Sequence, residues 1–457
     1  MDPNRKSSTR APPWGAQYAP AEEPADKKRS PPDDPPDPVK RARVEEGGMS
    51  HSQEGSQISH PLPSIPPSRP SNFPIHPLTR FQGASASIKR PREIAHFSYD
   101  DNHEYKEDES GVNYYHPPQM GADLREGFDT FRHYEDTENP HLDSLLRTLV
   151  SKEKREGERV QTDFVMWRGM MTKIMTTPFD MFAEFDLFAT LHQGTIYIEE
   201  DFNKKAASRA SESNSQSRHA RPSHLPSHEI MTYFGYKFET LSLLPDLSSN
   251  VPRETIENRE KAVTSNYAQH CSIVRTGFGT HSLVLGGEVD GLWEPKPDLQ
   301  KFPDAPIQWI ELKTSEELGQ YPSDRDILKY ERKLLKFWAQ SFLLGVSKII
   351  VGFRTKHGIL RGLDVYETTK IPGMVRRGTG CWDGNTCINF ATAFLDHLKR
   401  SITQEGVYKI TLRKKSGVIE IAKVQQEGNG GILSEEFTTW RDDKAADTAR
   451  DGEGAPK

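Results

Sequence analysis

The amino-acid sequence predicts one α+β domain of about 340 residues, covering 86–425, between two disordered tails. Stretches with apolar residues at helical spacing are interspersed with short apolar runs that are typical of strands, so both element types occur along the whole domain. The hydrophobic fraction is 34%, which is low for an entirely globular chain and predicts that part of it is disordered. The net charge of −6 argues against a surface that binds nucleic acid throughout, although a local basic channel remains possible.

The N-terminal tail, residues 1–85, is rich in proline, serine and charged side chains. It holds too few apolar side chains to offset the entropy of an ordered chain, so we expect disorder there. Two basic clusters lie in it, Lys27 to Arg29 and Lys40 to Arg43. Their spacing of about ten residues resembles a bipartite nuclear localisation signal and predicts a nuclear protein. The alternative is a solvated run of charge in a disordered tail.

The first half of the domain predicts two helices, from Asn139 to about Lys154 and from Asp163 to Thr176, because apolar residues recur there every three or four positions. The second helix is expected to end before Pro178. A strand is predicted at 195–199. Residues 203–226 are polar and of low complexity, and they predict a flexible surface insertion.

The second half of the domain predicts strands at 233–241, 272–276, 281–292, 307–313, 348–355, 358–369 and 407–415. Helices are predicted at 324–344 and 385–402. Residues 426–457 are polar and glycine-rich, and they predict a second disordered tail. No apolar run reaches about 18 residues, so no membrane span is expected. Three cysteines without a CxxC pair argue against a zinc or disulfide framework and indicate an intracellular, reducing compartment.

One stretch, residues 285–315, gathers the side chains that are most suited to chemistry. Glu288 and Asp290 belong to its first predicted strand, and Glu311 and Lys313 belong to its second. Residues i and i+2 of a strand point to the same face. If the two strands pair, three carboxylates and one ammonium group therefore converge. Such hard oxygen ligands suit Mg²⁺ or Mn²⁺, and a lysine beside them suits a phosphate.

The pattern of an acidic residue followed by Glu311-x-Lys313 is typical of a large class of metal-dependent nucleases. In that chemistry the carboxylates hold an ion that polarises the scissile phosphate and lowers the pKa of bound water. Lys313 stabilises the developing charge or holds the attacking water. The alternative is a polar strand face with paired surface charges. The apolar context of both strands favours the metal site, and the carboxylate of Glu288 adds to it.

Four further residues matter, of which Glu239 and Arg168 have two interpretations each when they are taken alone. Glu239 is a fourth metal ligand or a charge at a strand end. Arg168 lies between apolar helical positions and is a phosphate ligand or a salt-bridge partner. Gln340 is expected to be exposed to solvent from the helical periodicity, and Cys271 to be a small buried residue.

Seven stretches together resemble one family, the DXO-type decapping and RNA 5′-end quality-control nucleases. They are, in chain order from Ile88 to Leu412, IKRPREIAHFSYD, FVMWRGMMTKIMTTPF, ATLHQGTIYIEE, YFGYKFE, GGEVDG, WIELKTS and KFWAQSFLLGV. The family includes nuclear fungal members that partner the Rat-type 5′→3′ exoribonuclease. The resemblance implies two mixed β-sheets flanked by helices, which enclose a deep active-site pocket. The long tails and the insertion at 203–226 depart from the compact family pattern.

The resemblance also implies an activity, the divalent-metal-dependent hydrolysis of RNA 5′ ends. Its reactions are the release of pyrophosphate from triphosphorylated RNA, the removal of incomplete or NAD caps and, in some members, 5′→3′ exonuclease action. The implied partners are single-stranded RNA 5′ ends, capped or triphosphorylated, and a nuclear 5′→3′ exoribonuclease. The implied setting is mRNA and rRNA processing in the nucleus.

Each position that matches a family motif takes a role by this resemblance. The metal ligands, for two Mg²⁺ or Mn²⁺ ions, are Glu239, Glu288, Asp290, Glu311 and the backbone carbonyl of Leu312. The substrate-binding residues are Trp167, Arg168, Gly169, Cys271, Glu288, Lys313 and Gln340. The catalytic residues are Glu288, Asp290, Glu311 and Lys313.

Two other functions are open at this point. The chain is a binding module with a vestigial site that mainly stabilises the exoribonuclease, or it is a DNA endonuclease of the same acidic-x-lysine class. All the motif residues are present, which favours a working site.

Overall fold

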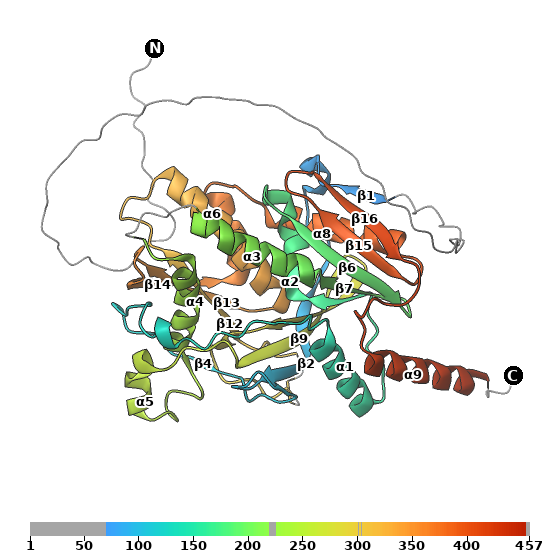
Figure 1. Ribbon diagram of the computed structural model, residues 1–457, viewed down its shortest axis with the longest axis horizontal. Coiled ribbons are helices and arrows are strands. Elements are labelled where there is room, and N and C mark those ends of the chain that lie inside the picture. The colour runs from blue at the N-terminus through green and yellow to red at the C-terminus, as the bar shows by residue number, and fades with distance from the viewer. Residues whose placement is uncertain (1–69, 219–224, 300, 303, 454–457) are drawn as a thin grey trace, which may run out of the picture. The chain divides into compact units, whose positions relative to one another are not determined.

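The computed structural model describes residues 70–218, 225–299, 301–302 and 304–453 (Figure 1). The two basic clusters and most of the predicted N-terminal tail lie outside the described residues. Within the described residues the strands form two mixed sheets with helices around them, as the sequence predicted. No helix of this part of the chain is long and apolar enough to cross a membrane.

The larger sheet has ten strands. Its order is β1 (Ser71–Pro74), β16 (Val418–Gln425), β15 (Val407–Leu412), β6 (Phe185–His192), β7 (Thr195–Glu200), β5 (Phe164–Trp167), β10 (His281–Glu288), β9 (Gln269–Phe278), β2 (Ile88–Tyr99) and β3 (Tyr105–Lys106). Strand β5 runs parallel to both of its neighbours, and the other pairs are antiparallel.

The smaller sheet has six strands. Its order is β14 (Leu360–Glu367), β13 (Lys348–Arg354), β12 (Trp309–Glu316), β11 (Gly291–Leu292), β4 (Tyr114–Tyr115) and β8 (Leu243–Leu244). The pairs β12 with β13 and β11 with β4 are parallel.

The run 281–292, predicted to be one strand, is divided between the two sheets. Strand β10 ends in the larger sheet at Glu288, and β11 begins in the smaller sheet after Val289 and Asp290. The predicted pairing with the next strand is therefore correct only for β11, which pairs antiparallel with β12. The buried Val289 donates its N–H to the carbonyl of His270 at 3.0 Å, which holds the crossing in place. Asp290 thus lies at the junction of the sheets.

The helices of the described chain are α1 (Asp143–Glu156), α2 (Arg168–Thr176), α3 (Phe202–Arg218), α4 (His228–Ser242), α5 (Arg253–Glu257), α6 (Asp324–Leu344), α7 (Ile371–Arg377), α8 (Gly384–Ser401) and α9 (Glu435–Glu453). Helix α6 has the predicted bounds. It begins with a capping box in which Ser323 and Asp326 exchange hydrogen bonds, and it ends before Gly345, whose φ of 72° suits glycine.

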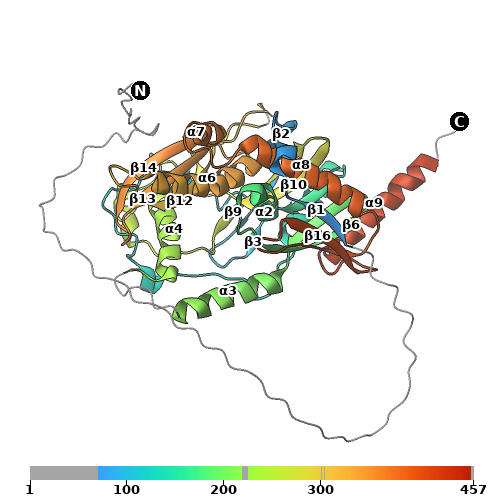
Figure 2. The same cartoon turned by 90° about the horizontal axis from the view of Figure 1, so that it is seen from above.

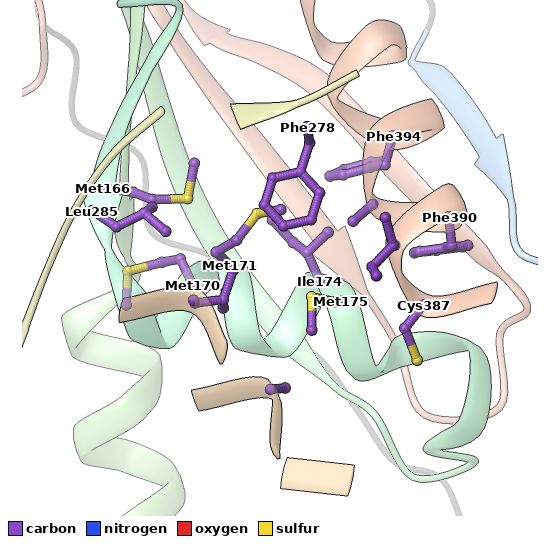
Figure 3. Close-up of a cluster of buried hydrophobic side chains, with 14 of the residues drawn as sticks. Met166, Met170, Met171, Ile174, Met175, Phe278, Leu285, Cys387, Phe390 and Phe394 are labelled. Carbon is purple, nitrogen blue, oxygen red and sulfur yellow. The ribbon is translucent and has the colours of Figure 1, made fainter. Parts of the chain in front are cut away.

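Helix α2 packs against both α6 and α8 beside the larger sheet. Figure 3 shows Met171, Ile174 and Met175 of α2 next to Cys387 and Phe390 of α8, and all of these side chains are buried. Each such side chain contributes about 1.5–3 kcal/mol when it leaves water. This core sets the position of the first turn of α2, where Arg168 lies.

Two predicted elements have a different secondary structure. The predicted helix 163–176 begins as strand β5, because its apolar run is covered on both sides by neighbouring strands, and only then turns into α2. The predicted strand 233–241 belongs to helix α4. Its buried residues Tyr233, Phe234, Phe238 and Leu241 share one helical face, and Ser227 caps the helix by accepting the N–H of Ile230.

The predicted unstructured segments are also corrected where the structure describes them. Residues 70–85 contain β1 and the buried Phe73 and Phe81, which pack on α8. The insertion forms helix α3 as far as 218, because it is rich in lysine, alanine and arginine and contains no glycine. The predicted C-terminal tail carries α9 and the buried Phe437, which packs in the same cluster as α1. Figure 1 shows α9 in dark red beside α1.

Candidate active site

The predicted site residues come from four elements that meet at the junction of the two sheets. Glu288 ends β10, Asp290 lies in the crossing, and Glu311 and Lys313 lie on β12. Glu239 belongs to α4, which packs on β12. The predicted gathering of carboxylates is therefore found, but it arises from the sheet crossing and a helix and not from two paired strands.

Glu311 is the most enclosed of the four site carboxylates, with a side chain that is 2% exposed. Its Oε1 lies 2.6 Å from Lys313 Nζ, and its Oε2 accepts a hydrogen bond from Arg168 Nη1 at 3.1 Å. The backbone N–H of Leu312 donates to Asp290 Oδ2 at 2.5 Å. The sequence left Arg168 as a phosphate ligand or a salt-bridge partner. In the structure it forms a salt bridge with a carboxylate of the site.

The carboxylates lie in one another's electric field. Burial and the charge of Asp290 raise the pKa of Glu288 to about 7, and burial and the charge of Glu311 raise the pKa of Asp290 to about 6. Burial, Asp290 and Glu288 hold the pKa of Glu239 well above its usual range. Burial acts the same way on Glu311, but the charges of Lys313 and Arg168 outweigh it and lower its pKa.

The charge balance of this group fits a divalent cation. Among the described residues, the cationic side chains that act most strongly on Glu239, Glu288, Asp290 and Glu311 are Arg168 and Lys313. Hard carboxylate oxygens of this kind suit Mg²⁺ or Mn²⁺. Across the residues that the structure describes, however, no three histidine, cysteine or carboxylate side chains are arranged to bind a metal. Lys313 and Arg168 contact the two carboxylate oxygens of Glu311, and both side chains would have to move before a metal ion could bind those oxygens.

Two glycines allow the walls of the site to approach. A Cβ on Gly286 would lie 2.7 Å from Leu145 and 2.8 Å from the ring of Trp167. A Cβ on Gly287 would lie 3.0 Å from Cβ of Arg168. The pair of glycines before Glu288 therefore serves close packing, which places Trp167 and Arg168 directly against β10.

A cavity of about 1290 Å³ opens beside Glu288, which is the one of the four site carboxylates that lines it. The predicted substrate residues Trp167, Gly169, Cys271 and Glu288 all line it. Cys271 stands opposite Glu288 across the β9–β10 ladder, and burial raises the pKa of its thiol, so it is a neutral lining residue and not a nucleophile. Gln340 is half-buried on α6, so the prediction from periodicity that it is exposed to solvent is wrong. It does not line the cavity, and its predicted contact with the substrate stays a prediction.

Most of the residues that line the cavity were not predicted from the sequence. One side is aromatic and the other, on α3 and α2, carries cationic side chains; the overlooked residues include Tyr99, His103, Phe128, Phe131, Tyr134, Lys173, Lys205 and Arg209. The density of aromatic residues between 97 and 134 was a usable signal, because such a run in a polar context suggests a binding surface. The polar composition of α3 concealed its part.

Behind Cys271 lies a buried polar cluster that makes the fold sensitive to acid. Burial lowers the pKa of His270 from 6.5 to about 4, although the charge of Glu93 opposes this. Burial acts to raise the pKa of Glu93, but hydrogen bonding with His96 and the charge of Lys296 lower it to about 2. Ser98 Oγ lies 3.0 Å from His270 Nδ1.

This cluster predicts a pH dependence of stability. As pH falls, the unfolded state binds a proton at His270 before the folded state does, so stability is lost from about pH 6.5 down to about pH 4. Between about pH 7 and about pH 5, the wild type should lose about 2 kcal/mol more than His270→Gln. Urea unfolding at both pH values measures this. Equal losses in the two proteins would contradict it.

Comparisons with known proteins agree with the geometry. Residues 89–438 match the model of the RAI1-like PD-(D/E)XK nuclease family. The chain is 48% identical over 370 residues to the decapping nuclease RAI1 of Emericella nidulans, covering 81% of this chain and 98% of that one. It is 31% identical over 376 residues to the decapping and exoribonuclease protein of Xenopus laevis, covering 78% and 87%.

Solved structures show the same architecture. Rai1 of Candida albicans, in complex with pU5 and Mn²⁺, superposes with a TM-score of 0.75 at 28% identity, covering 82% of this chain and all of that one. Rai1 of Scheffersomyces stipitis, in complex with (3′-NADP)⁺ and calcium, gives a TM-score of 0.72 at 27% identity, with coverages of 79% and 97%.

Proposed function

Because this chain belongs to the RAI1-like PD-(D/E)XK nuclease family and is a decapping nuclease, we propose that it removes incomplete or NAD caps and releases pyrophosphate from triphosphorylated RNA. The observation that carries the proposal is the group of four carboxylates beside Lys313, of which Glu288 lines a cavity of about 1290 Å³. The pU5 complex of one Rai1 structure supports RNA as the substrate, and the (3′-NADP)⁺ complex of the other supports NAD caps.

A divalent metal completes this site, and we propose one or two Mg²⁺ or Mn²⁺ ions. Asp290, Glu311, Glu239 and the carbonyl of Leu312 would hold them, and Glu288 would reach the metal directly or through water. When bound, the metal polarises the scissile phosphate and lowers the pKa of water. The Mn²⁺ and calcium ions of the related structures support a divalent ion.

The remaining residues act on the substrate. Lys313 and Arg168 form ion pairs with Glu311. Once a metal ion neutralises the carboxylates, both side chains would be free to bind substrate phosphates. Glu288 and Cys271 form the floor on which the first nucleotide rests, beside Trp167 and Gly169. We assign Gln340 to the attacking water by the family resemblance alone.

A panel of 5′ ends tests the activity. In Mn²⁺, the protein should release pyrophosphate from 5′-triphosphorylated RNA and remove NAD and incomplete caps, and duplex DNA should remain intact. An excess of chelator should abolish turnover, and added Mn²⁺ or Mg²⁺ should restore it, because the uncompensated carboxylates repel the phosphate. Turnover that persists in chelator, or cleavage of DNA in preference to RNA, would contradict the proposal.

The proposal extends to a partner and a compartment. By resemblance to the nuclear fungal members, we place the protein in the nucleus beside a 5′→3′ exoribonuclease. The two basic clusters support the compartment. The alternative function, a non-catalytic stabilising subunit, is tested by mixing the proteins at micromolar concentration. A complex and a higher melting temperature of the exoribonuclease support the partnership, and the absence of both rejects it.

A further inference from the structure

His141 has an uncommon backbone conformation shortly before α1. Its φ is 46°, in the left-handed region that histidine and asparagine tolerate better than most side chains do. The side chain of Asn139 supports this turn, because its Oδ1 accepts the N–H of His141 at 3.0 Å. In this conformation the carbonyl of His141 accepts the indole N–H of Trp167 at 3.1 Å. The backbone of His141 therefore contacts a residue assigned to substrate binding.

The imidazole ring of His141 is held on two sides. Its Nδ1 donates to the carboxylate of Glu199, whose oxygens lie at 2.9 and 3.1 Å and whose side chain is only 6% exposed. Glu199 belongs to β7, which pairs in parallel with β5, and Trp167 is the last residue of β5. A Cβ on Gly431 would lie 3.3 Å from Cε1 of the ring. Gly431 precedes α9, which projects from the domain in Figure 2.

Two kinds of contact hold the ring of Trp167. Close packing fixes its distance from β10, because a Cβ on Gly286 would lie 2.8 Å from the six-membered part of the ring. The hydrogen bond to His141 acts on the opposite part, and it sets the rotation of the ring because hydrogen bonds weaken steeply when they are bent. Trp167 is half-buried and lines the same cavity as Glu288. The direction of its exposed part thus depends on His141.

We propose that His141 is a positioning residue, whose bond with Glu199 fixes the backbone carbonyl that orients the Trp167 indole towards the substrate. Without this bond the backbone is free to leave the left-handed region, and its carbonyl turns away from the indole. The inference rests on the proposed function, in which Trp167 binds the substrate, and adds the residue that sets its orientation. Because His141 also lines the cavity, a direct contact with the substrate is the alternative that the experiment has to separate.

Two substitutions of His141 separate a loss of its contacts from their repair. His141→Ala removes the ring and disfavours the left-handed backbone. It should raise KM for 5′-triphosphorylated RNA by about tenfold and change kcat by less than about twofold, because the carboxylates of the site are untouched. His141→Asn should bring KM back to within about threefold of the wild type, because the amide Nδ2 takes the place of Nδ1 and asparagine tolerates a positive φ.

Gln193→Ala is the matched control for a strained backbone. Gln193 has the same φ of 46°, lies in the turn between β6 and β7, and does not line the cavity. The substitution should lower the melting temperature and leave KM unchanged. A purely structural role of His141 would act in the same way, because it would reduce the fraction of folded protein and the apparent kcat but not KM.

A double variant tests whether His141 acts through the indole. Trp167→Phe keeps an aromatic ring and removes the N–H that His141 accepts, so it should raise KM on its own. Adding His141→Ala to it should raise KM no further, because the bond between the two residues is already lost. A second increase of about tenfold would mean that His141 contacts the substrate itself. That result, or a His141→Ala protein with the KM of the wild type, overturns the inference.

A measurement without substrate tests the orientation of the indole directly. The emission of Trp167 is the difference between the spectra of proteins with and without Trp167→Phe. It should shift to longer wavelength in His141→Ala, because an indole released from its carbonyl is more accessible to water, and it should stay in place in His141→Asn and Gln193→Ala. An unchanged emission in His141→Ala overturns the inference. A protein that shows the shift and fails to release pyrophosphate refutes the proposed function alone.

Discussion

Replacing Asp290 by asparagine is expected to lower kcat for pyrophosphate release by about 10³-fold or more and to leave the fold intact. The carbonyl oxygen of asparagine still accepts the N–H of Leu312, which Asp290 Oδ2 accepts at 2.5 Å. The substitution removes one negative charge from the carboxylate group, and with it an anionic metal ligand whose electrostatic contribution amounts to several kcal/mol. Initial rates with 5′-triphosphorylated RNA and Mn²⁺ measure the effect.

Asp290 is a cleaner test than Glu311. Removing Glu311 also leaves Arg168 and Lys313 enclosed without their shared carboxylate, so a loss of stability would accompany the loss of activity. The matched control is Asp246→Asn, which changes the same side chain at an exposed position after β8. It should retain wild-type rates. A folded Asp290→Asn protein that releases pyrophosphate normally would refute the assignment of the site.

Replacing Arg441 by alanine is expected to reduce the free energy of unfolding by about 3–5 kcal/mol. Arg441 Nη2 donates to Glu153 Oε1 at 2.6 Å, and the two side chains are only 2% and 1% exposed. The variant would leave the charge of Glu153 buried with only the N–H donors of Val160 and Trp440. Guanidinium unfolding, followed by circular dichroism, measures the change.

A matched exposed pair provides the control for this prediction. Arg253 and Glu257 are 2.5 Å apart on α5, with side chains 89% and 58% exposed. Arg253→Ala should cost less than about 1 kcal/mol, because water screens that pair. If Arg441→Ala cost no more than Arg253→Ala, α9 would not be fastened to α1 by the buried pair, and the helix would contribute little to the stability of the domain.

The site could be recognised in the sequence because its chemistry is local. Glu311 and Lys313 alternate along one strand, and the capping box and Gly345 define α6, so both are visible at short range. The crossing at Asp290 has no such local signal. It depends on which strand each half of the run meets, and those partners lie far away in the chain.

The segments whose secondary structure was predicted incorrectly have a different cause in common. The stretch 233–241 alternates aromatic and polar residues well enough to suggest a strand, but its burial follows a helical face that only the core reveals. Helix α3 and the segment around Phe437 looked polar, and their contacts with the cavity wall and with α1 are tertiary. The composition of a segment indicates how much apolar surface it can bury. It does not show which distant part of the chain the segment will pack against.

The order of strands in the larger sheet has a consequence for protein synthesis. Strand β1 pairs only with β16 at that edge, so Phe73 and its neighbours have no sheet to join until residues 418–425 have left the ribosome. Until then β1 has no partner strand, and the side chain of Phe73, which is buried in the folded protein, stays uncovered. Strand β1 therefore joins the sheet late, through a contact between segments that lie far apart in the chain.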